Sequence, residues 1–219
     1  MPSSSSTIDW HLIPYAEALE KQQTLVQRRI AGEIPDTLIL CEHPATYTFG
    51  ARPGAESHLL VPQETLDQRG VAVHHTSRGG DVTAHNPGQL VAYPIVSLDK
   101  KRDLHAFLRL LEDVIIATLA QFSVHGERRE GKTGIWLGTR KIAAIGVAAR
   151  NWVTYHGLAI NVANDLAFFD GIVPCGIAAS EGTVTSLLRE QPVDPVSIAE
   201  VKSVLTVEFW RLFETFLRS

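Results

Sequence analysis

The sequence from Lys132 to Val162, KTGIWLGTRKIAAIGVAARNWVTYHGLAINV, decides the fold class. The short links Gly138-Thr139 and Arg150-Asn151 suit tight hairpins between extended, mainly apolar segments. The sequence therefore predicts consecutive strands over three segments: Gly134 to Leu137, Lys141 to Ala149 and Trp152 to Val162.

Helices and further strands are predicted on the N-terminal side of this region and beyond it. Asp103 opens an amphipathic segment to about Phe122, with Leu104, Phe107, Leu108, Leu111, Ile115 and Leu119 on its apolar side. The other predicted helices are Pro14 to Ile30 (apolar at Ala16, Leu19, Val26 and Ile30), Pro62 to Gln68, and Asp194-Pro195 to about Leu217. The other predicted strands are Thr37 to Cys41, Thr46 to Gly50, Val71 to Ser77 and Gln89 to Leu98. Strand runs mixed with long helices indicate an α+β fold with mixed α/β layers.

Length and composition favour one domain over residues 1–219, with residues 1–7 as a disordered tail because they are serine-rich. A formal net charge of −4 argues against nucleic-acid binding through a broad basic patch. The absence of an 18-residue apolar run argues against a membrane span, and the N-terminus has no secretory pattern. Two cysteines in a chain of this size favour a reducing, cytoplasmic compartment.

The motifs give no metal site. The nine histidines form no HExxH pattern, and no cysteine pair has zinc-finger spacing. His74 and His75 are adjacent, so in a strand their side chains point to opposite faces.

Cys175 is the first candidate for chemistry. Pro174 and Gly176 flank it and favour a turn that presents the thiol. A thiol must become a thiolate to attack, and this requires a neighbouring cation or base. Most free cysteines are instead small buried hydrophobes, and the local sequence leaves both interpretations open. Cys41 follows the apolar run Leu38 to Leu40 and is predicted to be a core residue.

Lys141 is the second candidate. It begins an otherwise apolar strand, where loss of hydration lowers the pKa of a lysine and lets it exchange a proton with a thiol. The commoner alternative is a strand-end lysine with its ammonium in water.

Two glycine-containing stretches are candidates for ligand contacts. Arg78 to Gln89, RGGDVTAHNPGQ, combines polar side chains with glycines that let a ligand approach the backbone and offer N–H groups to an anion. His156-Gly157 interrupts an apolar strand and suggests a close approach by another group. A long turn and a bulge with a satisfied histidine are the respective alternatives.

Taken together, these segments resemble the lipoyl(octanoyl) transferases. The resemblance covers about residues 37 to 188 and rests on RGGDVTAHNPGQLVAYPI, KTGIWLGTRKIAAIGV, YHGLAINV, DGIVPCGI and VTSL in this order. It implies the fold of the catalytic domain of biotin and lipoate protein ligases, a mixed β-sheet flanked by helices. Two positions depart from the family's usual loop: Ala84 replaces a common aromatic residue, and Asn86 replaces a common glycine.

The resemblance also implies roles for individual residues. Cys175 is the expected acyl-thioester nucleophile, and Lys141 is its acid/base partner. The expected substrate-binding residues are Arg78, Gly79, Gly80, Asp81, Val82, Thr83, Ala84, His85, Ala144, Ile145, Gly146, His156, Gly157, Leu158 and Ala159.

The implied reaction transfers an octanoyl or lipoyl group from acyl carrier protein to a lysine, without a metal or other cofactor. The implied acceptors are lipoyl domains of 2-oxoacid dehydrogenases and the glycine cleavage H protein. A basic cluster, Arg128, Arg129, Lys132 and Arg140, is either a docking surface for the carrier or an ordinary solvated face. Two alternatives to the implied function are an ATP-dependent lipoate or biotin protein ligase of the same fold and a non-catalytic acyl-binding module.

Overall fold

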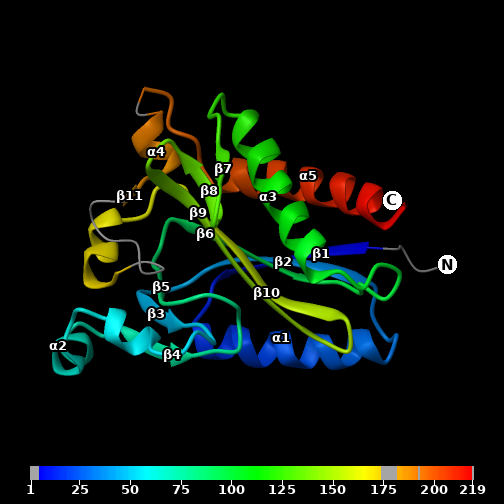
Figure 1. Cartoon of the computed structure of the whole chain (residues 1–219), viewed down its shortest axis with the longest axis horizontal. Helices are drawn as coiled ribbons and strands as arrows, with labels where there is room; N and C mark the ends of the chain where they lie inside the picture. The colour runs from blue at the N-terminus through cyan, green and yellow to red at the C-terminus, as the bar shows by residue number, and fades with distance from the viewer. Residues whose placement is uncertain (1–4, 174–181, 192, 219) are drawn as a thin grey trace.

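A mixed eight-stranded sheet forms the centre of the molecule (Figure 1). The computed structural model describes residues 5–173, 182–191 and 193–218. The strand order is β1 (Ser5–Leu12), β2 (Asp36–Glu42), β6 (Gln89–Ile95), β10 (Val153–Asn161), β9 (Arg140–Arg150), β8 (Lys132–Leu137) and β7 (Glu127–Arg129), while the short β11 (Thr183–Val184) pairs with β9. The predicted hairpins are confirmed, because β8, β9 and β10 pair antiparallel in sequence order.

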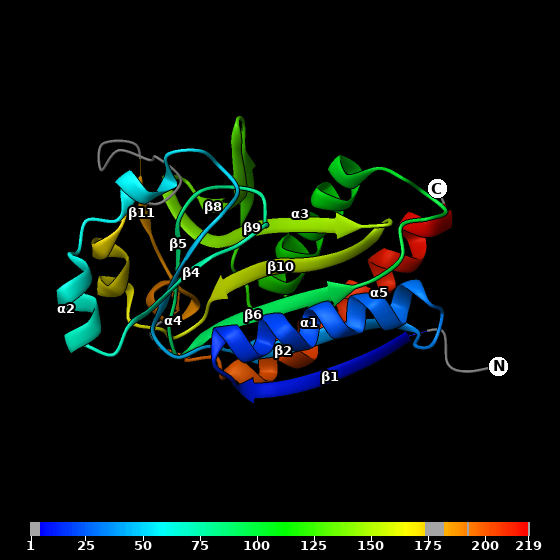
Figure 2. The same cartoon turned by 90° about the horizontal axis from the view of Figure 1, so that it is seen from below.

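Three long helices cover the two faces of this sheet. Helices α3 (Leu104–Ala120) and α5 (Ile198–Arg218) pack together on one face, and α1 (Tyr15–Ile30) lies on the other (Figures 1 and 2). The larger core lies under α3 and α5, and a second core lies under α1. The predicted α+β architecture of mixed layers is confirmed.

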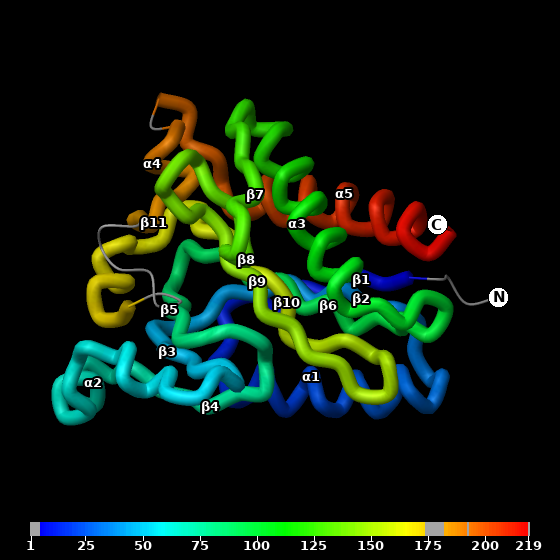
Figure 3. Tube along the Cα trace, in the orientation of Figure 1, coloured from blue at the N-terminus to red at the C-terminus, as the bar shows by residue number. Residues whose placement is uncertain are grey.

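A smaller sheet flanks the α1 face and has the order β4 (Ala72–His75), β3 (Thr46–Phe49) and β5 (Thr83–His85). It forms the core of a lobe with the short helix α2 (Gln63–Gln68) and the 3₁₀ helices η1 (Ala55–His58) and η2 (Leu166–Gly171) (Figure 3). The Arg78 segment, residues 78–89, follows β4; its first part passes beside β9 and it then forms β5. This small sheet therefore positions the loop that the sequence singled out.

Local capping explains where α3 and α5 begin. The Asp103 carboxylate accepts a hydrogen bond from the Ala106 N–H at 2.8 Å, as expected for an N-cap. The predicted start of the last helix at Asp194-Pro195 is wrong. Helix α5 begins at Ile198, where Ser197 and Glu200 exchange side-chain and backbone hydrogen bonds in a capping box.

The buried face of α1 also differs from the prediction. Ala16 is exposed, and the buried positions are Tyr15, Ala18, Gln22 and Val26. Gln22 is on this face because its Oε1 accepts a hydrogen bond from the backbone N–H of His156 at 2.9 Å. The buried face of α1 therefore includes a polar residue with a tertiary hydrogen bond.

The predicted disordered tail is wrong for residues 5–7, which belong to β1. Thr7 pairs with Leu38 of β2, and its Oγ1 accepts a hydrogen bond from the Trp210 indole N–H at 2.9 Å. Asp9 forms an ion pair with Lys202 of α5 at 2.9 Å. A polar segment becomes a strand here because a neighbouring strand and helix supply its partners.

Cys41 is a core residue, as predicted. Its side chain is fully buried, and burial raises the pKa of its thiol well above the usual range. Within the part of the chain that the structure describes, no helix is both long and apolar enough to cross a membrane.

Candidate active site

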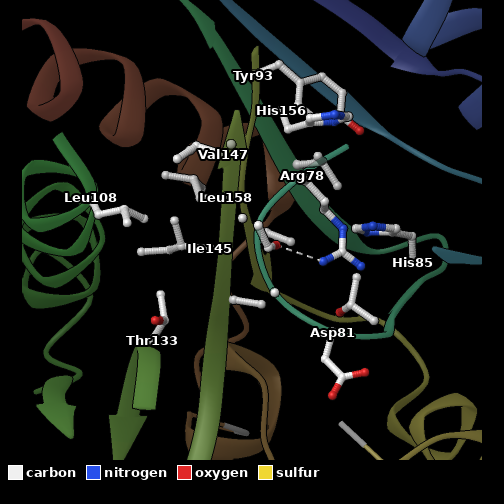
Figure 4. Close-up of a pocket in the computed structure, with 18 of the residues that line it drawn as sticks. Arg78, Asp81, His85, Tyr93, Leu108, Thr133, Ile145, Val147, His156 and Leu158 are labelled. Atoms are coloured by element: carbon white, nitrogen blue, oxygen red, sulfur yellow. Dashed lines mark hydrogen bonds between the residues drawn. The ribbon is translucent and has the colours of Figure 1, made fainter. Parts of the chain in front are cut away.

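A cavity of about 310 Å³ lies beside β9 where the Arg78 segment approaches it. This volume is at the lower end of the range for small-molecule sites. In Figure 4 the apolar side chains of Leu108, Ile145 and Leu158 lie on one side of the pocket, and Arg78 and His85 lie on the other. The cavity can therefore hold an apolar chain against one wall and polar groups against the other.

The structure brings nearly all of the described candidate residues to this cavity. Lys141 and fourteen of the fifteen expected substrate-binding residues line it. The exception is Ala84, which is fully buried in the core of the small lobe with Tyr47 and Val82. Since side chains alternate along a strand, Ala84 points away from the cavity that its neighbours Thr83 and His85 line.

Sequence reasoning missed a second set of lining residues. Val91 and Tyr93 of β6 are two positions apart and therefore share the face that meets α1, a periodicity that could have identified them. The other missed lining residues are Tyr15, Leu104, Leu108, Thr133 and Val147.

Lys141 is held at the Thr133 end of the cavity. Lys141 is only 7% exposed, and its Nζ lies 5.4 Å from the ring centroid of Trp136. In the β8–β9 ladder Trp136 is directly opposite Lys141, and Val184 of β11 is its partner on the other side. The position of this ammonium is therefore defined by the sheet rather than by a loop. This differs from the alternative of a lysine at the end of a strand with its ammonium in water.

Arg78 anchors the polar wall. Its guanidinium donates hydrogen bonds to the backbone oxygen of Thr48 at 2.5 Å and to the Thr48 hydroxyl at 3.0 Å. A Cβ added to Gly146 would lie 2.7 Å from the Gly79 oxygen and 3.2 Å from Arg78 Cδ. Glycine at position 146 therefore lets the Arg78 segment lie directly against β9.

The idea that this segment offers free amides to an anion is only partly supported. The Gly79 N–H donates to the Val147 oxygen at 3.0 Å, and the Val82 N–H donates to the Asp81 carboxylate at 2.7 Å. Asp81 is also bound to His58 at 2.8 Å. These two amides hold the segment in place and are not available for an oxyanion.

A hydrogen-bond chain connects the Arg78 segment with the strand of Lys141. The His85 Nδ1–H donates to Gln89 Oε1 at 2.7 Å, and Gln89 Nε2 donates to Asn161 Oδ1 at 2.9 Å. Asn161 Nδ2 in turn donates to the Thr185 oxygen, and the Thr185 N–H donates to the Lys141 oxygen, both at 2.9 Å. Fully buried networks of this kind define one geometry and lose it when a member is removed.

His156 lies at the end of the cavity near Tyr93 (Figure 4). Its φ of +57° interrupts the alternation of side chains along β10, as expected for a local irregularity of the strand. Its Nδ1 has no hydrogen-bond partner among the described residues. A Cβ on Gly157 would lie 2.0 Å from the Ala92 oxygen, so glycine is required for β6 and β10 to pair here.

Asn86, which replaces a common glycine of the family's loop, does not occupy a left-handed backbone conformation. Its Nδ2 donates to the Asp165 oxygen at 2.9 Å, and its Oδ1 accepts from Asn164 at 3.1 Å. It therefore connects the end of the Arg78 segment to the loop after β10.

Three buried histidines make acid sensitivity an expected property of the fold. Burial lowers the pKa of His43 and of His156 to about 4, and that of His85 to about 3. In the unfolded chain each has a pKa near 6.5, so between about pH 6.5 and 4 the unfolded state binds more protons. The free energy of unfolding should fall as the pH falls through this range, by up to about 1.4 kcal/mol per pH unit for each group.

Urea unfolding at pH 7, 6 and 5 measures this dependence. His43→Gln should make the pH dependence of the free energy of unfolding less steep. His125→Gln, at an exposed position, should leave this dependence unchanged. An equally steep dependence in the His43 variant would assign the acid sensitivity to other groups.

The basic cluster predicted from the sequence is partly used within the protein. Arg128 pairs with Glu112 and Asp113, each at 2.7 Å, and Arg140 pairs with Glu190 at 2.8 Å. These contacts weigh against the carrier-docking hypothesis.

The predicted nucleophile Cys175 lies outside the described residues. Before it, the Val173 N–H donates to the His58 oxygen at 2.8 Å, and after it the chain re-enters the sheet as β11 beside Arg140 and Lys141. Among the described residues no group of three or more His, Cys, Asp or Glu side chains is arranged to hold a metal ion.

A family model for the lipoyl protein ligase A/B catalytic domain matches residues 14–210. The chain belongs to this family. Its relatives in the lipoyl protein ligase A/B family include the octanoyltransferase of Syntrophotalea carbinolica, which is 46% identical over 210 residues that cover 95% of this chain and 94% of that protein. The octanoyltransferase of Rubrobacter xylanophilus is 51% identical over 180 residues, 82% of this chain and 80% of that protein.

Solved structures confirm the expected fold of this family. A lipoate-protein ligase A bound with ATP superposes with a TM-score of 0.75 over 98% of this chain and 86% of that chain, at 16% identity. A biotin protein ligase from Aquifex aeolicus in complex with biotin and ATP gives 0.61 over 99% and 73%, at 10% identity. At these identities the similarity establishes the fold alone.

Proposed function

We propose that this protein transfers an octanoyl group from a carrier thioester to a lysine of a lipoyl domain through an acyl-thioester on Cys175. The observation that carries the proposal is the buried Lys141 at a cavity with an apolar wall, in a chain that is 46% identical to an octanoyltransferase over nearly its whole length. The cavity suits an aliphatic chain, and the lysine suits a proton transfer.

The reaction needs two transfers at one sulfur. In the first, Lys141 accepts the thiol proton, the Cys175 sulfur bonds to the thioester carbon, and the carrier's carbon–sulfur bond breaks. The departing carrier sulfur accepts this proton from Lys141. In the second, a lysine amine of the acceptor bonds to the acyl carbon and the carbon–sulfur bond to Cys175 breaks. The amine loses a proton to Lys141, which passes it to the Cys175 sulfur. Because the thioester already carries the activation, no nucleotide is consumed.

The apolar wall supplies affinity for the acyl tail. Burial of a methylene is worth about 0.8 kcal/mol, so the tail of an octanoyl group contributes on the order of 5 kcal/mol. Ile145 and Leu158 of neighbouring strands face this tail in the proposed complex. One methylene more or less changes the free energy of binding by about 1–3 kcal/mol, so cavity depth gives only moderate chain-length selection.

The donor in this proposal is octanoyl-acyl carrier protein. The acceptors are lipoyl domains of 2-oxoacid dehydrogenases and the glycine cleavage H protein. The reaction takes place in the cytoplasm, where both thiols of the chain stay reduced.

Intact mass spectrometry after mixing the protein with octanoyl-acyl carrier protein tests the proposal. We expect one octanoyl adduct without ATP, and peptide mapping should assign it to Cys175 rather than to the buried Cys41. Octanoylation of a lipoyl domain only with octanoate and ATP would favour the ligase alternative. Binding without an adduct or any transfer would favour the acyl-binding module.

A further inference from the structure

Trp136 is the residue across the sheet from Lys141. It belongs to β8 and is the register partner of Lys141 in β9, so the two side chains share one face of the sheet. Trp136 is only 1% exposed, and it is not among the residues that line the cavity. Among the described residues, Trp136 therefore reaches the cavity through its neighbour Lys141.

The Trp136 ring is close to two cations. The Lys141 Nζ lies 5.4 Å from its centroid, and the Arg129 Cζ lies 5.2 Å from it. Tryptophan is the best aromatic partner for a cation, and the attraction is stronger when the cation is desolvated. Lys141 is only 7% exposed, which favours a strong contact with the ring.

The backbone around Trp136 also restricts the lysine. Gly134 has a φ of +115°, and a Cβ there would lie 2.7 Å from Lys141 Cε and 3.3 Å from its Nζ. The lysine side chain therefore occupies the space over Gly134. A Cβ on Gly182 would lie 3.2 Å from Trp136 Cζ3, so the ring is also packed against the residue that precedes β11.

We propose that Trp136 is a positioning residue for Lys141: its ring holds the lysine ammonium at the end of the cavity where the proton transfers take place. Trp136 forms no bond with the substrate and exchanges no proton. The inference rests on the proposed function, since it gives Trp136 a role only if Lys141 takes part in the reaction.

The first experiment compares Trp136→Phe with Trp136→Met by single-turnover acylation with octanoyl-acyl carrier protein. Both variants reduce the side-chain volume, but only phenylalanine keeps an aromatic face. We expect phenylalanine to keep the acylation rate within about threefold and methionine to lower it about tenfold, the kinetic equivalent of about 1.4 kcal/mol. KM for the carrier should change less than twofold in both, and equal losses in the two variants would overturn the proposal.

Site-specific incorporation of fluorinated tryptophan at position 136 keeps the ring size and the fold. Each added fluorine weakens the attraction between the ring and a cation, so the acylation rate should fall stepwise along the series. A rate independent of the number of fluorines would contradict a cation–π role.

A double-mutant cycle separates this proposal from the proposed function. In a Lys141→Ala background, Trp136→Met should have no further effect on the residual rate, because the group it positions is gone. The same tenfold loss in that background would show that Trp136 acts on the fold alone. If Lys141→Ala retains the wild-type rate, the role of Lys141 in the proposed function fails; if it loses activity while the fluorinated series is flat, only the positioning role fails.

Discussion

Replacement of Cys175 by alanine is expected to abolish the octanoyl adduct and to lower turnover by about three orders of magnitude or more. The proposed reaction has no other nucleophile, and removal of a nucleophile from a covalent mechanism eliminates both half-reactions. Intact mass and steady-state transfer to a lipoyl domain measure the two effects in the same preparation.

Cys41→Ala is the matched control, because it removes the other thiol of the chain. Cys41 is fully buried in the core under α1, with its Sγ 3.6 Å from His43 Nε2. We expect this variant to keep its adduct and its turnover while losing some stability. An adduct that persists on the Cys175 variant and disappears from the Cys41 variant would identify Cys41 as the nucleophile and contradict the proposal.

Replacement of Lys141 by alanine is expected to lower the rate of both half-reactions by about 10²- to 10⁴-fold, the usual contribution of a positioned acid/base group. KM for the carrier should change little, because the acyl tail is bound by the apolar wall of the cavity. Pre-steady-state acylation and deacylation of the acyl-enzyme measure the two steps separately.

Two further variants make this result specific. Lys132→Ala removes a lysine from the adjacent strand, outside the residues that line the cavity, and should leave both rates within about twofold of wild type. Lys141→Arg keeps a positive charge but cannot give up its proton near neutral pH. Wild-type rates in the arginine variant would mean that position 141 supplies charge rather than proton transfer.

Local sequence signals predicted the centre of the sheet well. The segments that became β8, β9 and β10 combine apolar residues with two short links, and the Asp103 carboxylate caps α3 from within its own turn. The capping box at Ser197 and Glu200 is an equally local signal for the start of α5. Such features are readable because all of the interacting atoms lie within a few residues of one another.

The sequence of any single segment does not predict how the site is assembled. Lys141 and Arg78 are 63 positions apart, and both line the cavity because Gly79 bonds to Val147 and Gly146 has no Cβ to keep the Arg78 segment away from β9. The resemblance to a known family supplied the set of residues but placed Ala84 in the pocket, where strand alternation does not put it. It also gave no indication of the wall formed by Val91 and Tyr93 of β6.

The sequence by itself determined the hairpin strands at the centre of the sheet, most of the long helices and the fold class, because periodicity, capping and turn chemistry act over short distances along the chain. The tertiary structure alone decided that the polar residues Ser5 to Thr7 belong to a strand, that Gln22 faces the core, and that Trp136 lies against Lys141. Each of these depends on partners far away in the sequence, and a residue's own pattern carries no information about which distant group will satisfy its hydrogen bonds or its charge.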